Sequence, residues 1–205
     1  LHPLNRRQRQ MCIRDSISDS SYDENKRWPD GLSPFGFKVV KEMNKQGVMI
    51  DISHVSDAAF MKVLELSKAP VVATHSSLRH FTPGWERNVS DEMLIALAEN
   101  GGVIQLCFGS DFVANRKDNP DIEVSVKNVV DHIDRVRDLV GIDHVGFGSD
   151  FDGEVPLPED INDVSKFPNL IEELLIRGYT ESEIDKILNE NILRVWKEVR
   201  ALADV

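Results

Sequence analysis

The sequence predicts an α/β fold built around a parallel β-sheet. Short apolar runs rich in β-branched residues alternate with segments whose apolar residues recur at helical spacing. Strands of that composition are buried on both faces, which is typical of parallel sheets covered by helices. Polar residues stand where several of these apolar runs end, and this is the edge at which parallel α/β proteins place their functional groups.

Four strands are expected after an initial helix, each followed by a helix, with one more helix at the end. The predicted strands are 48–53, 71–74, 103–108 and 144–150. The predicted helices are 33–46, 56–66, 90–99, 125–140, 168–177 and 180–202. Most of them start at Ser or Thr, whose side chains cap exposed backbone N–H groups. In the last helix, Trp196 is expected on the buried face. Strand–helix pairs of roughly 20 to 45 residues suit half of a (β/α)8 barrel or a small doubly wound sheet, and the pattern alone leaves both open.

Composition excludes several classes of protein. The 205 residues are 41% hydrophobic and 29% charged, as in ordinary globular domains. No apolar stretch is long enough to span a membrane. A net charge of −11 without a basic face argues against nucleic-acid binding through phosphates. The two cysteines, Cys12 and Cys107, form no framework of spaced pairs, so a disulfide scaffold is not expected.

The first 16 residues differ from the rest of the chain. They carry four Arg and one Asp and show neither a helical nor a strand period. They also lack the apolar core of a secretory signal. We expect residues 1–16 to be a foreign or disordered leader, similar to a translated cloning scar, and residues 17–205 to form the folded protein.

Histidine and aspartate follow three of the predicted strands. His54 comes after the first strand, His75 after the second, and Asp150 at the end of the fourth. Imidazole is a common ligand of zinc, zinc-bound water ionises near neutral pH, and a nearby Asp can transfer the proton. Two histidines on neighbouring strand ends with an Asp favour a metal site over purely structural roles.

Other residues carry weaker signals. Arg87, in the loop after the second strand, could bind a carboxylate, although an Arg in such a loop is most often on the surface. Cys107 is interpreted as a small core residue, and alternation along the first strand points Asp51 away from the neighbours of His54. Three further histidines have no partner at a useful spacing and are interpreted as structural: His80, His132 and His144.

Several motifs, in order, resemble the carboxyl half of the membrane (renal) dipeptidase family of zinc peptidases over about residues 17–200. They are VVKEMNKQGVMIDISHVSD, VVATHSS, ERNVSDEML, ENGGVIQLCF, HVGFGSDFDG and DVSKFPNLIEELLIRGYTESEI. The resemblance implies a (β/α)8 TIM barrel of the metal-dependent hydrolase type, of which this chain would contain only the C-terminal half: about four βα units and the C-terminal helices.

The resemblance also implies an activity and its residues. Members of the family hydrolyse dipeptides at a site with two Zn2+ ions. By position, His54 and His75 match two ligands of one zinc. Asp150 matches the aspartate that handles protons at the substrate, and Arg87 matches the arginine that binds the substrate's terminal carboxylate.

The remaining zinc ligands of the family, a His-x-Asp pair and a bridging glutamate, have no counterpart before His54. We therefore expect a truncated chain with little or no dipeptidase activity. Open sheet edges would favour a homodimer or aggregation. The polar end VWKEVRALADV carries no lipid-anchor signal, so a soluble cytoplasmic enzyme is expected. Two alternatives stay open: another metal-dependent amidohydrolase, and a noncatalytic α/β binding module.

Overall fold

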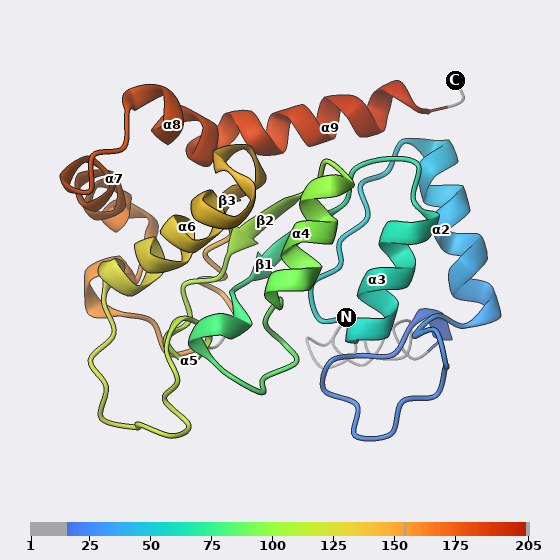
Figure 1. Cartoon of the computed structure of the whole chain (residues 1–205), viewed down its shortest axis with the longest axis horizontal. Helices are drawn as coiled ribbons and strands as arrows, with labels where there is room; N and C mark the ends of the chain where they lie inside the picture. Colours follow the sequence, from blue (N-terminus) through green and yellow to red (C-terminus); the bar gives the residue numbers. More distant parts are fainter. Residues whose placement is uncertain (1–15, 154, 204–205) are drawn as a thin grey trace, which may run out of the picture.

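A three-stranded parallel sheet lies at the centre of the fold (Figure 1). The structure, a computed structural model, describes residues 16–153 and 155–203. The strands lie in the order β1 (Val72–Ser76), β2 (Val103–Leu106) and β3 (Val145–Phe147). The longer helices are α2 (Pro34–Gln46), α3 (Asp57–Leu66), α4 (Asp91–Glu99), α6 (Val126–Val140), α7 (Phe167–Ile176) and α9 (Asn191–Ala201). Shorter turns of helix are α5 (Ser110–Val113), α8 (Glu181–Asp185), η1 (Arg79–Phe81), η2 (Ile142–His144), η3 (Glu159–Ile161), η4 (Val164–Lys166) and η5 (Lys186–Glu190).

The predicted helix starts are confirmed by their caps. The hydroxyls of Ser33, Ser56 and Ser90 accept hydrogen bonds from backbone N–H groups in the first turns of α2, α3 and α4. Thr180 and Glu183 form the capping box expected from their spacing. Local capping chemistry therefore places these helices, and with them the loops that precede them. The predicted leader falls on residues 1–15, which lie outside the described residues, and on Ser16, whose carbonyl oxygen accepts from the Ser33 hydroxyl at 2.6 Å.

The prediction of a strand over 48–53 is wrong, although the segment does lie beside β1. It makes a single parallel bridge, between Asp51 and Val72, and the Ile52 N–H donates to Val72 O at 2.8 Å. The next step of a parallel ladder would use the Thr74 N–H, but this group donates to Asp51 Oδ1 at 3.0 Å. The carboxylate thus ends the ladder after one bridge.

The last helical region runs without a break from Glu181 to Ala201, as predicted. Within it, a turn of π-helix, η5, lies between α8 and α9. Val195 and Val199 are buried as predicted, whereas Trp196 is 43% exposed, against the expectation, with the Arg200 guanidinium 5.4 Å from its ring centroid.

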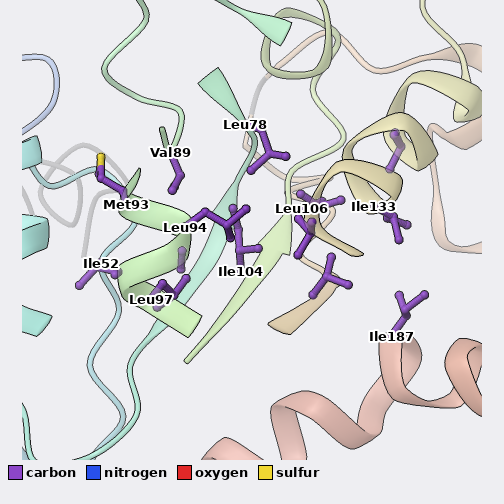
Figure 2. Close-up of a cluster of buried hydrophobic side chains, with 14 of the residues drawn as sticks. Ile52, Leu78, Val89, Met93, Leu94, Leu97, Ile104, Leu106, Ile133 and Ile187 are labelled. Carbon is purple, nitrogen blue, oxygen red and sulfur yellow. The ribbon is translucent and has the colours of Figure 1, made fainter. Parts of the chain in front are cut away.

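Helices cover one face of the sheet and close the end opposite the candidate site. Figure 2 shows Leu94 and Leu97 of α4 packed near Ile104 of β2, with Ile133 of α6 beyond them. At the amino ends of the strands, α9 is attached by Asn191 Nδ2, which donates to Val145 O at 2.8 Å. The carboxyl ends of the strands stay free for the loops. None of the helices in the described ranges has the length and apolar character needed to cross a bilayer.

A fully buried histidine joins two of those loops. His132 of α6 accepts the Leu78 N–H at Nδ1 (3.0 Å), and its Nε2 lies 3.2 Å from Val113 O. Its ring also stacks on Phe81 at a centroid distance of 4.3 Å. Burial lowers the pKa of His132 from 6.5 to about 4. The structural role expected for this residue agrees with these contacts.

Because His132 is buried and neutral, we expect the folded chain to lose stability at acid pH. The unfolded chain protonates His132 near pH 6.5 while the folded chain keeps it neutral down to about 4. The unfolded state therefore binds more protons in that range, and the free energy of unfolding falls as the pH drops, by up to about 3 kcal/mol. Urea unfolding of the wild type between pH 7 and pH 4 measures the loss. His132→Gln should show a shallower slope than the wild type, and equal slopes in the two proteins would show that His132 does not cause the loss.

Candidate active site

Two histidine side chains meet at the carboxyl end of β1. His75 is the penultimate residue of that strand, and His54 follows the segment that lies beside it. Their Nε2 atoms are 2.8 Å apart and their ring centroids 4.8 Å apart. The structure therefore brings together the two residues that the strand-end positions and the family resemblance had singled out as metal ligands.

Two of the residues singled out from the sequence have strained backbones. Among the described residues, the non-glycine positions with positive φ are His54 (69°) and Asp150 (63°). A residue with a Cβ in this region costs on the order of 1 kcal/mol or more, and such strain concentrates at functional sites. At His54 it is held by Ser21, whose N–H donates to the His54 carbonyl at 2.9 Å, and by a bridge between Ser20 and Val55.

Arg87 lies against the histidine pair rather than on the surface. Its side chain is buried, with 3% of the residue exposed, so the surface position expected from its loop alone is wrong. Nη1 donates to Ser76 Oγ at 2.8 Å, and Nη2 donates to the His75 carbonyl and lies 3.3 Å from His54 Nε2. Its Nε is buried without a hydrogen-bond partner among the described residues. The guanidinium thus keeps one N–H donor that no described residue uses.

The loop that carries Arg87 is fastened at its base and along its length. Val89 pairs with Leu78 in a parallel bridge. Asn88, fully buried, donates from Nδ2 to Thr82 Oγ1 (2.7 Å) and Phe112 O (2.8 Å). Arg79 makes a two-pronged ion pair with Asp57, at 2.6 and 2.7 Å. These bonds hold the backbone that positions the Arg87 guanidinium.

Asp150 follows a different strand from the one that carries His75, and no hydrogen bond joins it to His54, His75 or Arg87 among the described residues. It follows β3, and the only side-chain hydrogen bond recorded for it among the described residues comes from Cys107 Sγ, at 3.9 Å. Two residues before it, the chain passes close to β1, because a Cβ on Gly148 would lie 2.0 Å from Thr74 O. Only glycine allows this approach. The charge of Asp150 acts on both Arg87 and Cys107.

Burial sets the protonation of two groups near the site. Burial lowers the pKa of Arg87, while the nearby charges of Asp150 and Asp51 act in the opposite direction. Burial raises the pKa of the Cys107 thiol to about 11. The thiol therefore stays protonated at neutral pH, which agrees with the interpretation of Cys107 as a core residue rather than a nucleophile.

The two imidazole nitrogens are spaced closely enough to share a zinc ion. Two ligands of tetrahedral zinc at about 2.05 Å are about 3.3 Å apart, so the Nε2 atoms of His54 and His75, at 2.8 Å, need only a small outward movement. Imidazole nitrogen is a preferred zinc donor. In the described parts of the chain, no group of three or more His, Cys, Asp or Glu side chains is placed to hold a metal. The described residues fit zinc as a partial ligand set.

Several residues at the site were missed by sequence reasoning. Ser76 and Asn88 position Arg87, and Thr74 and Asp51 contact each other behind His75. Their small polar side chains give no periodic or spacing signal. Two signals in the sequence could have identified them. Asn88 and Thr74 are direct neighbours of Arg87 and His75, and Asp51 is a charged residue within an otherwise apolar run.

Comparison with known proteins places these observations in a family. The family model described as membrane dipeptidase (peptidase family M19) matches residues 10–205. This range begins earlier than the resemblance traced above and includes part of the expected leader. It covers every residue of the site described here.

Solved structures agree with the fold. The probable dipeptidase PvdM from Pseudomonas aeruginosa is similar with a TM-score of 0.84 and 29% identity, over 92% of this chain and 60% of that one. A metallo peptidase from Rhodobacter sphaeroides, liganded with a phosphinate mimic of the dipeptide L-Ala-D-Ala, is similar with a TM-score of 0.76 and 35% identity, over 83% and 48%. An amidohydrolase from Pseudomonas aeruginosa gives 0.78 and 30%, over 90% and 61%. This chain spans about half to three-fifths of their lengths, and the similarity confirms the predicted α/β fold.

Proposed function

Because the chain belongs to the membrane dipeptidase family, we propose that it forms part of a metal-dependent dipeptidase site that hydrolyses the peptide bond of dipeptides. The observation that carries the proposal is the meeting of His54 and His75 at 2.8 Å beside a buried Arg87. A noncatalytic module has no need for two converging imidazole nitrogens next to a buried cation with an unused donor.

The metal in this proposal is zinc, held by Nε2 of His54 and Nε2 of His75. When bound, zinc supplies a water molecule that ionises near neutral pH and a positive charge that polarises the peptide carbonyl. The two histidines act as neutral ligands and keep their rings at the strand ends. The strained backbone of His54 supports this role, because it aims the ring at His75 rather than along the chain.

Arg87 binds the substrate's terminal carboxylate in this proposal. Its Nε is the buried donor without a partner, while its Nη atoms are held by Ser76 and His75. A charge-assisted hydrogen bond from such a rigid guanidinium fixes the register of a short peptide. A carboxylate one residue beyond the scissile bond is the feature that separates a dipeptide from a longer chain.

Asp150 transfers protons. It lies at the carboxyl end of β3, across β2 from His75, on the same edge of the sheet. As a carboxylate it accepts the proton of the attacking water and passes it to the leaving amine. Its positive φ is an unfavourable backbone conformation, which supports a role in which the direction of the side chain matters.

Two ligands are fewer than the three that catalytic zinc sites usually take from a protein, and the described residues place no third. We therefore expect the 205-residue chain with added zinc to turn over glycyl-dehydrophenylalanine slowly or not at all. Efficient hydrolysis in a spectrophotometric assay would contradict this expectation.

Substrate class is tested by binding rather than by turnover. The zinc-loaded chain should bind glycyl-dehydrophenylalanine more tightly than the C-terminal amide of the same dipeptide, because only the acid can pair with Arg87. Calorimetric titration of both compounds measures the difference. Equal affinities would favour another amidohydrolase, acting on a lactam, cyclic amide or ester, and no binding by either compound would favour a noncatalytic module.

A further inference from the structure

A chain of hydrogen bonds runs from a carboxylate to one of the two histidines. The Thr74 hydroxyl donates to Asp51 Oδ2 at 2.7 Å, and Thr74 Oγ1 also lies 2.7 Å from His75 Nδ1. Asp51, Thr74 and His75 thus form a hydrogen-bonded series that ends at a candidate metal ligand. None of the roles assigned above to the site residues uses Asp51 or Thr74.

The number of protons decides the direction of these bonds. An ionised carboxylate only accepts hydrogen bonds, and a hydroxyl has a single proton to donate. The Thr74 proton therefore goes to Asp51, and Thr74 Oγ1 is left to accept. Nδ1 of His75 must then carry a proton and donate it to Thr74 Oγ1. A neutral imidazole with its proton on Nδ1 has a lone pair on Nε2.

We propose that Asp51 and Thr74 are positioning residues that hold His75 in the tautomer whose Nε2 carries a lone pair, directed at His54. This inference rests on the proposed function, in which Nε2 of His75 is a zinc ligand. Metal-binding histidines commonly owe their tautomer and ring orientation to a hydrogen bond at the other ring nitrogen. Here the carboxylate acts through an intervening hydroxyl.

The backbone around Asp51 is arranged to hold the carboxylate in this place. Oδ1 accepts the N–H groups of Ser53 (2.9 Å) and Thr74 (3.0 Å), which leaves Oδ2 directed at the Thr74 hydroxyl. The Thr74 N–H would otherwise continue the β-ladder. Because it bonds the Asp51 carboxylate instead, residues 48–53 form a single bridge and not a strand. The same contacts explain why Asp51 faces the site, against the expectation from alternation.

An isosteric substitution can reverse the bonds without removing them. In Asp51→Asn, the amide can still accept the two backbone N–H groups, but its NH2 donates to Thr74 Oγ1. The Thr74 proton then turns to His75 Nδ1, and the imidazole proton moves to Nε2, where it blocks the lone pair. Thr74→Val removes the hydroxyl at nearly the same volume, and Thr74→Ser restores it.

The tautomer is read on the metal-free chain by long-range 1H–15N NMR of the histidine rings at about pH 8, where neutral imidazole predominates. His75→Gln identifies the His75 signals. The wild type and Thr74→Ser should carry the proton on Nδ1, and Asp51→Asn should carry it on Nε2. A wild-type His75 protonated on Nε2, or an unchanged tautomer in folded Asp51→Asn, overturns the proposal whether or not the chain binds zinc.

Zinc affinity supplies the second reading. Competition titration with a chromophoric chelator should show about 10- to 100-fold weaker binding for Asp51→Asn and Thr74→Val, with Thr74→Ser near the wild type. Circular dichroism and thermal melts verify that each variant is folded. If His75→Gln loses zinc and Thr74→Val does not, the relay is wrong and the metal site stands. If the wild type binds no zinc, the proposed function fails, and the tautomer measurement still decides the relay.

Discussion

Replacing His75 by Ala is expected to weaken zinc binding by about 100-fold. Four-ligand protein zinc sites reach roughly 10–16 kcal/mol of binding free energy, so one ligand accounts for about 3 kcal/mol, or about two powers of ten in affinity. His54→Ala should have a loss of similar size, because the two Nε2 atoms face each other at 2.8 Å and would share one ion. Competition titration with a zinc chelator measures both.

A third histidine variant controls for effects unrelated to the site. His80→Ala changes an exposed ring that packs on Phe81, and it should leave the zinc affinity unchanged. Thermal melts verify that the three variants are folded. Equal zinc affinities in the wild type and in all three variants would show that His54 and His75 are structural, which is the noncatalytic reading.

Replacing Arg87 by Lys is expected to remove most of the preference for a dipeptide acid over its amide. A hydrogen bond to a charged group contributes about 1.5–3 kcal/mol, which corresponds to roughly a 10- to 100-fold preference. Lys keeps the positive charge, but all its donors lie on one terminal nitrogen, so it has no counterpart of the Nε–H that Arg87 keeps while its Nη atoms bond Ser76 and His75. Calorimetric titration of the acid and amide measures the preference in each variant.

Arg135 offers a matched control. It pairs with Asp91 on a partly exposed part of the helical layer, away from the histidine pair, so Arg135→Lys should keep the wild-type preference. Arg87→Lys is also expected to lower the melting temperature, because it leaves the buried Ser76 hydroxyl and the His75 carbonyl short of donors. An undiminished preference in folded Arg87→Lys would assign carboxylate recognition to another residue.

Helix starts could be predicted from the sequence because they depend on contacts between residues close together in the chain. Ser33, Ser56, Ser90 and Thr180 start their helices through contacts within four residues, so a single sequence is enough to locate them. His54 and His75 were also predictable as neighbours, since parallel strands bring their carboxyl ends to one edge. In these cases a short-range pattern and the final structure depend on the same interactions.

The failures share a dependence on contacts distant in sequence. Asp51 ends a strand only because Thr74, on another element, uses its carboxylate in place of the ladder. Arg87 is buried because Asn88 fastens its loop to Phe112. Charge and loop position alone had favoured the surface.

If His54 and His75 hold a zinc ion at the carboxyl edge of the sheet, anomalous X-ray diffraction will locate it between their rings. Data would be collected at the zinc absorption edge from crystals of the 205-residue chain grown with zinc. An anomalous peak is expected within bonding distance of both Nε2 atoms, with Asp51 and Thr74 in their present contacts. No peak at that position, with both rings well ordered, would contradict the proposed zinc site.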